Sequence, residues 1–266
     1  MGLTVHFKLA APADGSAAQA KRLVESMRRV ALRFQREGLV DRVLPITLEA
    51  TTLRRFARDW LILPVPGSPR GVSSGTSPGQ ATRPTPQSEE NTSTGVEVCP
   101  AQGFLFRVDV GEDCEPLWLG LCRYPETILH QGRELQTKIG SGWRLAGFSK
   151  TQYASLHGWE HFQRCHCAVV NLLAACRTPG LRVKISDEGD YWPTRSLTGL
   201  RQNLDQMNGL VAASAGALKD CYEAAEGESP VQSPIFAHRQ FERLEAEGAA
   251  RVGPVLKQLR AIVREA

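Results

Sequence analysis

The stretch from Gly147 to Cys167, GFSKTQYASLHGWEHFQRCHC, gathers side chains that could perform acid–base or metal chemistry. Within it, His157-Gly-Trp-Glu160-His161 matches H-x-x-E-H, a pattern in which two histidines bind zinc and a glutamate acts as base. Gly158 is a poor helix residue, however, and the helix is predicted to begin near Trp159, which leaves His157 outside it. We therefore predict no metal site here.

Cys165, His166 and Cys167 follow in the same helix. Successive helical residues turn by about 100°, so Cys165 and Cys167 project about 200° apart and cannot bind one metal ion together. One interpretation makes Cys165 a buried thiol and His166 a hydrogen-bonded core residue. The other makes His166 a general acid or base at the border of the core.

A second polar group, Asp187-Glu188-Gly189-Asp190-Tyr191-Trp192, follows the strand expected over 181–186. A strand is also expected over 142–153, and a helix over 159–176 joins the two. If the two strands are adjacent and parallel, their trailing loops lie at one edge of the sheet, where ligand sites gather in open α/β sheets. The alternative is a polar turn, with Thr194 or Ser196 capping the helix that follows.

The roles expected at that edge are as follows. The catalytic candidates are Lys150, His166, Asp187 and Glu188, and the ligand-binding candidates are Tyr153, Arg164, Tyr191 and Trp192.

The segments GFSKTQYAS, RCH and DEGDYW resemble parts of an uncharacterised group of bacterial proteins. The resemblance covers roughly residues 142–220. It implies a bacterial protein, but it implies no activity and no ligand.

The elements that position these residues predict an α+β fold, in which a mixed sheet packs against helices. Alternation over Leu3, Val5 and Phe7 predicts a first strand, and an apolar spacing of three and four predicts a helix within 16–37. Further strands are expected over 40–48, 60–65, 103–110 and 116–123, the last two as a hairpin, with a short helix over 52–59. Two long apolar patterns, 197–222 and 241–262, predict a C-terminal antiparallel helical pair.

Residues 66–95 are rich in Gly, Ser, Thr and Pro and hold almost no large apolar side chain. Such a segment cannot bury enough surface to fold, so we predict a disordered insert. Residues 1–65 alone would form a marginal core, and we therefore predict one domain made of 1–65 and 96–266.

Composition adds little about partners. The net charge is +4, from 32 basic and 28 acidic residues, and no apolar run approaches the roughly 18 residues of a membrane span. Seven irregularly spaced cysteines favour free thiols in a reducing cytoplasm. We therefore expect a soluble cytoplasmic protein with no membrane partner.

Arginines recur over residues 22–58 and predict a weakly basic patch, in which Arg29 and Arg33 would contact a partner. Interspersed acidic residues make a merely solvated helix face the simpler interpretation.

Two functions remain open. The first is a module that binds a protein or a phosphate-bearing ligand, favoured because no catalytic set is complete. The alternative is a hydrolase or phosphate-group transferase whose site lies between the loops after 142–153 and 181–186. The chain carries no Walker loop, no G-x-G-x-x-G after a strand and no G-x-S-x-G, and we predict no cofactor.

Overall fold

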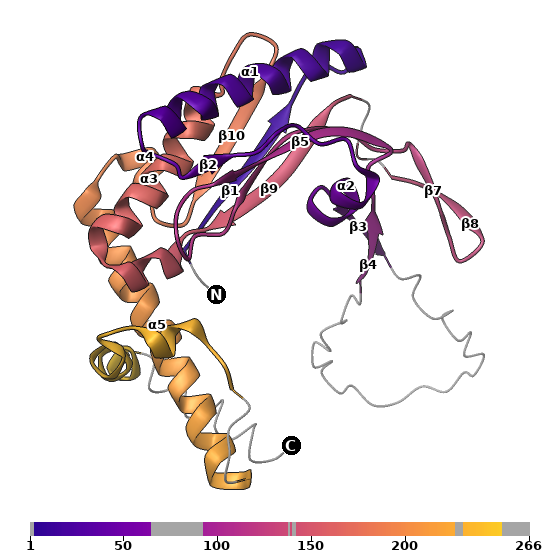
Figure 1. Cartoon of the computed structure of the whole chain (residues 1–266). Helices are drawn as coiled ribbons and strands as arrows, with labels where there is room; N and C mark the ends of the chain where they lie inside the picture. The colour runs from indigo at the N-terminus through magenta and orange to yellow at the C-terminus, as the bar shows by residue number, and fades with distance from the viewer. Residues whose placement is uncertain (1–2, 65–92, 138, 140–141, 227–230, 252–266) are drawn as a thin grey trace, which may run out of the picture.

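The computed structural model describes residues 3–64, 93–137, 139, 142–226 and 231–251 (Figure 1). The strands are β1 (Thr4–Ala10), β2 (Arg42–Val43), β3 (Asp59–Pro64), β4 (Ser93–Val98), β5 (Gln102–Asp109), β6 (Leu117–Arg123), β7 (Thr127–His130), β8 (Arg133–Gln136), β9 (Arg144–Lys150) and β10 (Arg182–Asp187). The helices are α1 (Ala17–Arg36), α2 (Ala50–Phe56), α3 (Trp159–Ala175), α4 (Tyr191–Thr194), α5 (Leu197–Glu226), the 3-10 turns η1 (Gln152–His157) and η2 (Pro234–Ala237), and a helix over 241–251.

One six-stranded sheet forms the centre of the fold, in the order β10-β1-β9-β6-β5-β2. The α+β class predicted from the sequence is confirmed. The sheet is not mixed, however, because every pairing described is antiparallel. β1 separates β9 from β10, so these two strands run in the same direction without being neighbours, and α3 connects them in a split β-α-β arrangement.

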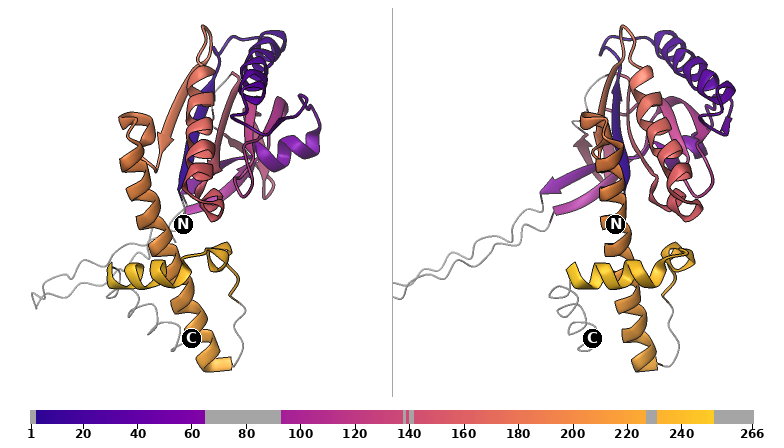
Figure 2. Two further views of the ribbon diagram at one scale, coloured as in Figure 1. Left: turned by 60° about the vertical axis from the view of Figure 1, so that its left-hand side comes forward. Right: turned by 90° about the vertical axis from the view of Figure 1, so that its left-hand side faces the viewer.

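Helices α1 and α3 cover one face of the sheet (Figure 2). On β1 this face carries Val5, Phe7 and Leu9, all buried, as the alternation predicted. Ser16 caps α1 by accepting a hydrogen bond from the amide of Gln19. The apolar stripe of α1 then packs onto the sheet through Val24, Met27, Ala31 and Phe34.

Among the described residues, α2 covers the opposite face at its β5–β6 side. A side chain at Gly103 would meet Leu53 of α2, and Phe56 stacks on Trp118 of β6 with ring centroids 4.1 Å apart. Gly103 pairs with Cys122, and Cys122 pairs with Arg144, which places α2 on the face that Arg144 shares. The outward side chains of β9, β1 and β10 on this face form what we call the open face. They are Arg144, Ala146, Phe148, Lys150, His6, Lys8, Ala10, Arg182, Lys184 and Ser186; Thr4, at the start of β1 on the same face, is buried.

The predicted hairpin over 103–123 is present as β5 and β6, whereas the β7–β8 hairpin was not predicted. The expected strand over 40–48 is reduced to β2 and a single bridge at Thr47. Residues 65–92, most of the predicted insert, lie outside the described residues, and Ser93–Gly95 belong to β4.

At the C-terminus, α5 extends beyond the sheet, and the helix over 241–251 packs across α5 (Figures 1 and 2). The two backbones nearly touch, because a Cβ on Gly248 would lie 1.9 Å from the carbonyl oxygen of Gly209. Packing of two C-terminal helices is therefore confirmed, although residues 252–262 of the predicted second helix lie outside the described residues. None of the described helices has the length and apolarity needed to cross a membrane.

Candidate functional site

The two loops expected to share an edge of the sheet do so, with the start of β1 between them. After β9, the amide of Thr151 donates to the carbonyl of Leu3 at 3.0 Å. After β10, the amide of Glu188 donates to the carbonyl of Thr4 at 3.1 Å. The loops therefore meet through β1 rather than by direct pairing of β9 with β10.

His166 of α3 connects the two loops from inside the core. Its Nδ1 lies 2.8 Å from the Thr151 hydroxyl, and its Nε2 lies 3.0 Å from Oδ1 of Asp187. The second contact is close enough for an ion pair when the imidazole is protonated, but too bent for a regular hydrogen bond. The side chains of His166 and Asp187 are both 0% exposed.

The Asp187 carboxylate also organises the loop that follows β10. Oδ1 accepts from the amide of Gly189 and Oδ2 from the amide of Trp192, each at 2.8 Å. Burial alone would raise the pKa of Asp187, but the His166 ring and these two backbone amides outweigh it and lower the pKa from its ordinary value. The carboxylate is therefore held ionised within the fold.

A hydroxyl, an imidazole and a carboxylate in a row are the components that activate a nucleophile in many enzymes. Here Thr151 is 0% exposed, and Gly189 covers the ring so closely that a Cβ there would lie 2.9 Å from Nε2 of His166. A substrate cannot reach the hydroxyl in this arrangement. The three side chains tie α3 to both loops, as the core interpretation of His166 anticipated.

The other candidate residues lie away from this buried contact. Lys150 is on the open face, with Nζ 4.0 Å from Glu115. Glu188 accepts from the amide of Thr4 and lies 3.4 Å from Nε2 of His6. Arg164 pairs with Asp41 at 3.2 Å. The structure thus unites His166 with Asp187 and separates Lys150 and Arg164 from them.

The aromatic candidates surround the loop after β10. Arg195 lies over the rings of Tyr191 and Trp192. Arg177 also lies over the Trp192 ring, 4.8 Å from its centroid. Tyr153 is half-buried in η1. Their ligand-binding roles, like the catalytic roles above, stay predictions.

Near the start of α3, the helix begins at Trp159 as predicted, so His157 lies outside it. His157 contacts Asp113 at 2.8 Å, and His161 contacts the carbonyl of Glu112 at 2.9 Å. Both histidines therefore hold the β5–β6 turn. Cys165 is fully buried, and all seven cysteines are free thiols.

On α1, Arg29 is exposed and Arg33 approaches Glu37 at 4.0 Å. Both belong to the helix-covered side of the sheet. Their role in binding a partner stays a prediction.

The open face holds the features that sequence reasoning missed. Phe148 is 55% exposed, and its ring lies 6.0 Å from that of His6 on the neighbouring strand. Lys8 lies directly opposite Lys184, and Arg182 lies two residues earlier on β10. In the described part of the chain, none of these three cations is paired with a carboxylate. Alternation around Phe148 in GFSK and around Lys8 in HFKLA was the available signal.

Comparison of the chain with protein-family models, with curated proteins and with solved structures gives no match.

Proposed function

We propose that this protein is a binding module that holds single-stranded nucleic acid on its open face. The observation that carries the proposal is an exposed aromatic ring, Phe148, on the open face beside three cations, Lys8, Arg182 and Lys184. Among the described residues, no carboxylate pairs with any of the three.

The cations supply the contacts to phosphate. Lys8 and Lys184 face each other across β1 and β10, an arrangement of like charges that lowers the stability of a sheet. Lysines on an edge strand such as β10 discourage strand pairing between molecules, but β1 is an interior strand, so this purpose does not account for Lys8. A bound polyanion would offset the repulsion between the two lysines, and the two positive charges would in turn raise its affinity.

The aromatic ring supplies the contact to a base. Stacking of a base on an exposed aromatic side chain contributes about 1–3 kcal/mol per base and tolerates any sequence. Phe148 and His6 occupy directly opposite positions on β9 and β1, so two adjacent rings are available. Because duplex bases already stack on one another, a single strand is the form that can use these rings.

The acidic groups near the open face are few and already engaged. Glu115 lies near Lys150, Asp59 near Arg144, and Glu188 near His6. Positive charge therefore remains towards the β10 side of the face, beside the rings.

The test measures the anisotropy of a short fluorescein-labelled oligothymidine titrated with the protein at low salt. We expect Phe148→Ala and Lys8→Glu/Lys184→Glu each to weaken binding, the double charge reversal by about tenfold or more. Arg29→Glu/Arg33→Glu is the matched control, because it reverses the same number of charges on α1, over the opposite face of the sheet.

Equal losses in both charge-reversal variants would show that only overall charge matters and would overturn the assignment to the open face. Binding that Phe148→Ala leaves unchanged would exclude stacking. Tighter binding of the same sequence as a duplex would also contradict the proposal.

We do not propose the hydrolase or transferase as a second function. The hydroxyl, imidazole and carboxylate that the structure unites are buried, and Lys150, the group expected to stabilise negative charge, lies beside Glu115.

A further inference from the structure

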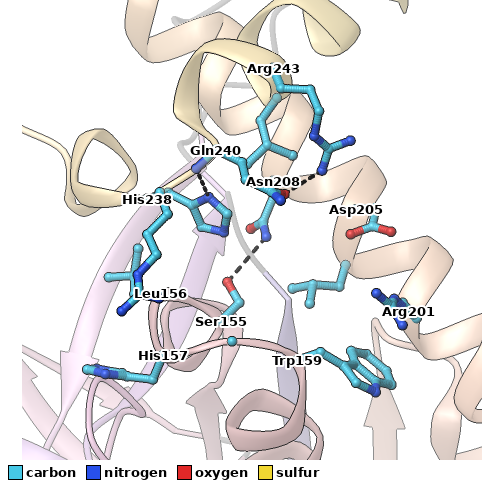
Figure 3. Close-up of a pocket in the computed structure, with 14 residues that line it drawn as sticks. Ser155, Leu156, His157, Trp159, Arg201, Asp205, Asn208, His238, Gln240 and Arg243 are labelled. Atoms are coloured by element: carbon cyan, nitrogen blue, oxygen red, sulfur yellow. Dashed lines mark hydrogen bonds between the residues drawn. The ribbon is translucent and has the colours of Figure 1, made fainter.

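A separate cavity of about 250 Å³ lies where η1, α5 and residues 238–244 meet (Figure 3). It shares no residue with the open face. Its charged and titratable lining consists of His157, Arg201, Asp205, His238, Arg239 and Arg243, and we call it the arginine pocket.

Positive charge predominates in the arginine pocket, with three arginines against the single carboxylate of Asp205. Arg239 is exposed, and no carboxylate among the described residues pairs with it. Arg201 lies over the Trp159 ring, 5.3 Å from its centroid, which fixes the guanidinium beside an aromatic wall. Of the three arginines, Arg243 is the one with an acidic partner among the described residues, Glu247 at 2.7 Å, and it also donates to Gln240.

Neutral hydrogen-bond donors line the arginine pocket together with these charged side chains. The Asn208 amide donates to the Ser155 oxygen at 3.2 Å and accepts from Gln152, so Asn208 is held in one orientation (Figure 3). Because the Ser155 oxygen accepts this bond, its hydroxyl hydrogen stays available to a ligand.

His238 is held in a form that can donate as well. Its Nδ1 accepts from the amide of Gln240 at 3.1 Å, which leaves the proton of the neutral ring on Nε2. Burial, and then the charge of Arg243, lower the pKa of His238, as expected in a positive environment.

We infer that the arginine pocket binds a phosphate monoester group. A guanidinium presents parallel N–H donors that match phosphate oxygens, and several cations together suit a dianion better than a monoanion. The volume lies at the small end of ligand sites, which fits a small ligand or a terminal group rather than an extended one. This inference is independent of nucleic-acid binding on the open face.

The probe is glycerol 3-phosphate, titrated calorimetrically into the full-length protein. We expect saturable binding that Arg239→Ala weakens by about tenfold or more, the effect of one lost charge-assisted contact. Arg239→Lys keeps the positive charge but loses the parallel N–H donors of the guanidinium, so it should weaken binding less than Arg239→Ala does. Arg251→Ala is the control, because Arg251 is an exposed arginine at the end of the helix that follows Arg239 and lies outside the arginine pocket.

Two arms distinguish the source of the phosphate. If a free small molecule is the ligand, oligothymidine with a 5′-phosphate should bind no more tightly than the unphosphorylated strand. If the end of a strand is the ligand, the 5′-phosphate should raise the affinity, and Arg239→Ala should remove that increase. Absence of glycerol 3-phosphate binding, equally tight binding of acetate, or an equal loss in Arg251→Ala would each overturn the inference.

Discussion

Lys8 of β1 lies directly opposite Lys184 of β10, and in the part of the chain that the structure describes neither ammonium group is paired with a carboxylate. Two like charges in register repel each other, so the fold carries an unfavourable interaction on an interior strand. We propose above that a polyanion relieves it. The repulsion itself can be measured without any ligand.

Replacing Lys8 with Thr, a good strand former, should raise the free energy of unfolding by about 0.2–1 kcal/mol because the repulsion is removed. Urea denaturation at low ionic strength is the measurement. The gain should shrink as salt screens the two charges. A variant that is less stable than the wild type at every salt concentration would contradict this account, and the same substitution should weaken binding of oligothymidine.

The buried carboxylate of Asp187 should make stability depend on pH at the acid end. Its pKa is lowered in the folded state from 3.8, so the unfolded chain takes up the proton more readily. The stability due to the ionised group is therefore complete above the unfolded pKa and is lost as the pH falls through the lowered folded pKa. Asp187→Asn should cost about 3–5 kcal/mol at neutral pH, as expected when one partner of a buried pair is removed.

The difference between wild type and Asp187→Asn should narrow as the pH falls below about 4. Urea denaturation across this range measures it. Glu188→Gln is the control, because this neighbouring carboxylate is exposed. A penalty for Asp187→Asn that does not change with pH would show that the charge of Asp187 is not the cause.

The contact between Gly209 and Gly248 should tolerate no added carbon. A Cβ on Gly248 would lie 1.9 Å from a backbone oxygen and 2.9 Å from the side chain of Ala213, so Gly248→Ala must push the two C-terminal helices apart. Overpacking of this kind costs roughly 1–3 kcal/mol. Because His238, Arg239, Gln240, Arg243 and Leu244 line the arginine pocket, binding of glycerol 3-phosphate should weaken as well.

Gly199→Ala is the matched comparison for that change. Gly199 lies in α5, and its added Cβ would meet only the side chain of Ser196, at 3.3 Å. Denaturation should show this variant at least as stable as the wild type, since alanine favours a helix over glycine. Equal loss in both variants would mean that the crossing of the helices is not what Gly248 protects.

Local patterns predicted most of the elements but not which strands would be neighbours in the sheet. The alternation of β1, the apolar stripe of α1 and the start of α3 at Trp159 are all visible in the sequence, because each depends on residues a few positions apart. The place of β1 between β9 and β10 depends on residues more than a hundred positions away, which no local period encodes. For that reason a mixed sheet was predicted and an antiparallel one is found.

The same distinction explains the site. The shared edge was expected on the condition of adjacent, parallel strands, whereas β9 and β10 run in the same direction with β1 between them. Of the catalytic candidates expected at that edge, the structure brings His166 and Asp187 into contact. Thr151 carried no signal in the sequence. Lys150 was expected beside His166 and Asp187, but it lies on the face of the sheet opposite α3. The sequence contained the reason: Lys150 is two residues after the exposed Phe148, and alternate residues of a strand point to the same face.

The interior position of β1, between β10 and β9, also has a consequence during synthesis. One of its two neighbours, β10, is completed only roughly 180 residues after β1 itself. At about 5–20 residues per second, this interval is on the order of ten to forty seconds. Throughout it the apolar side chains of Val5, Phe7 and Leu9, which are buried in the finished fold, lack their final surroundings and are open to non-native contacts.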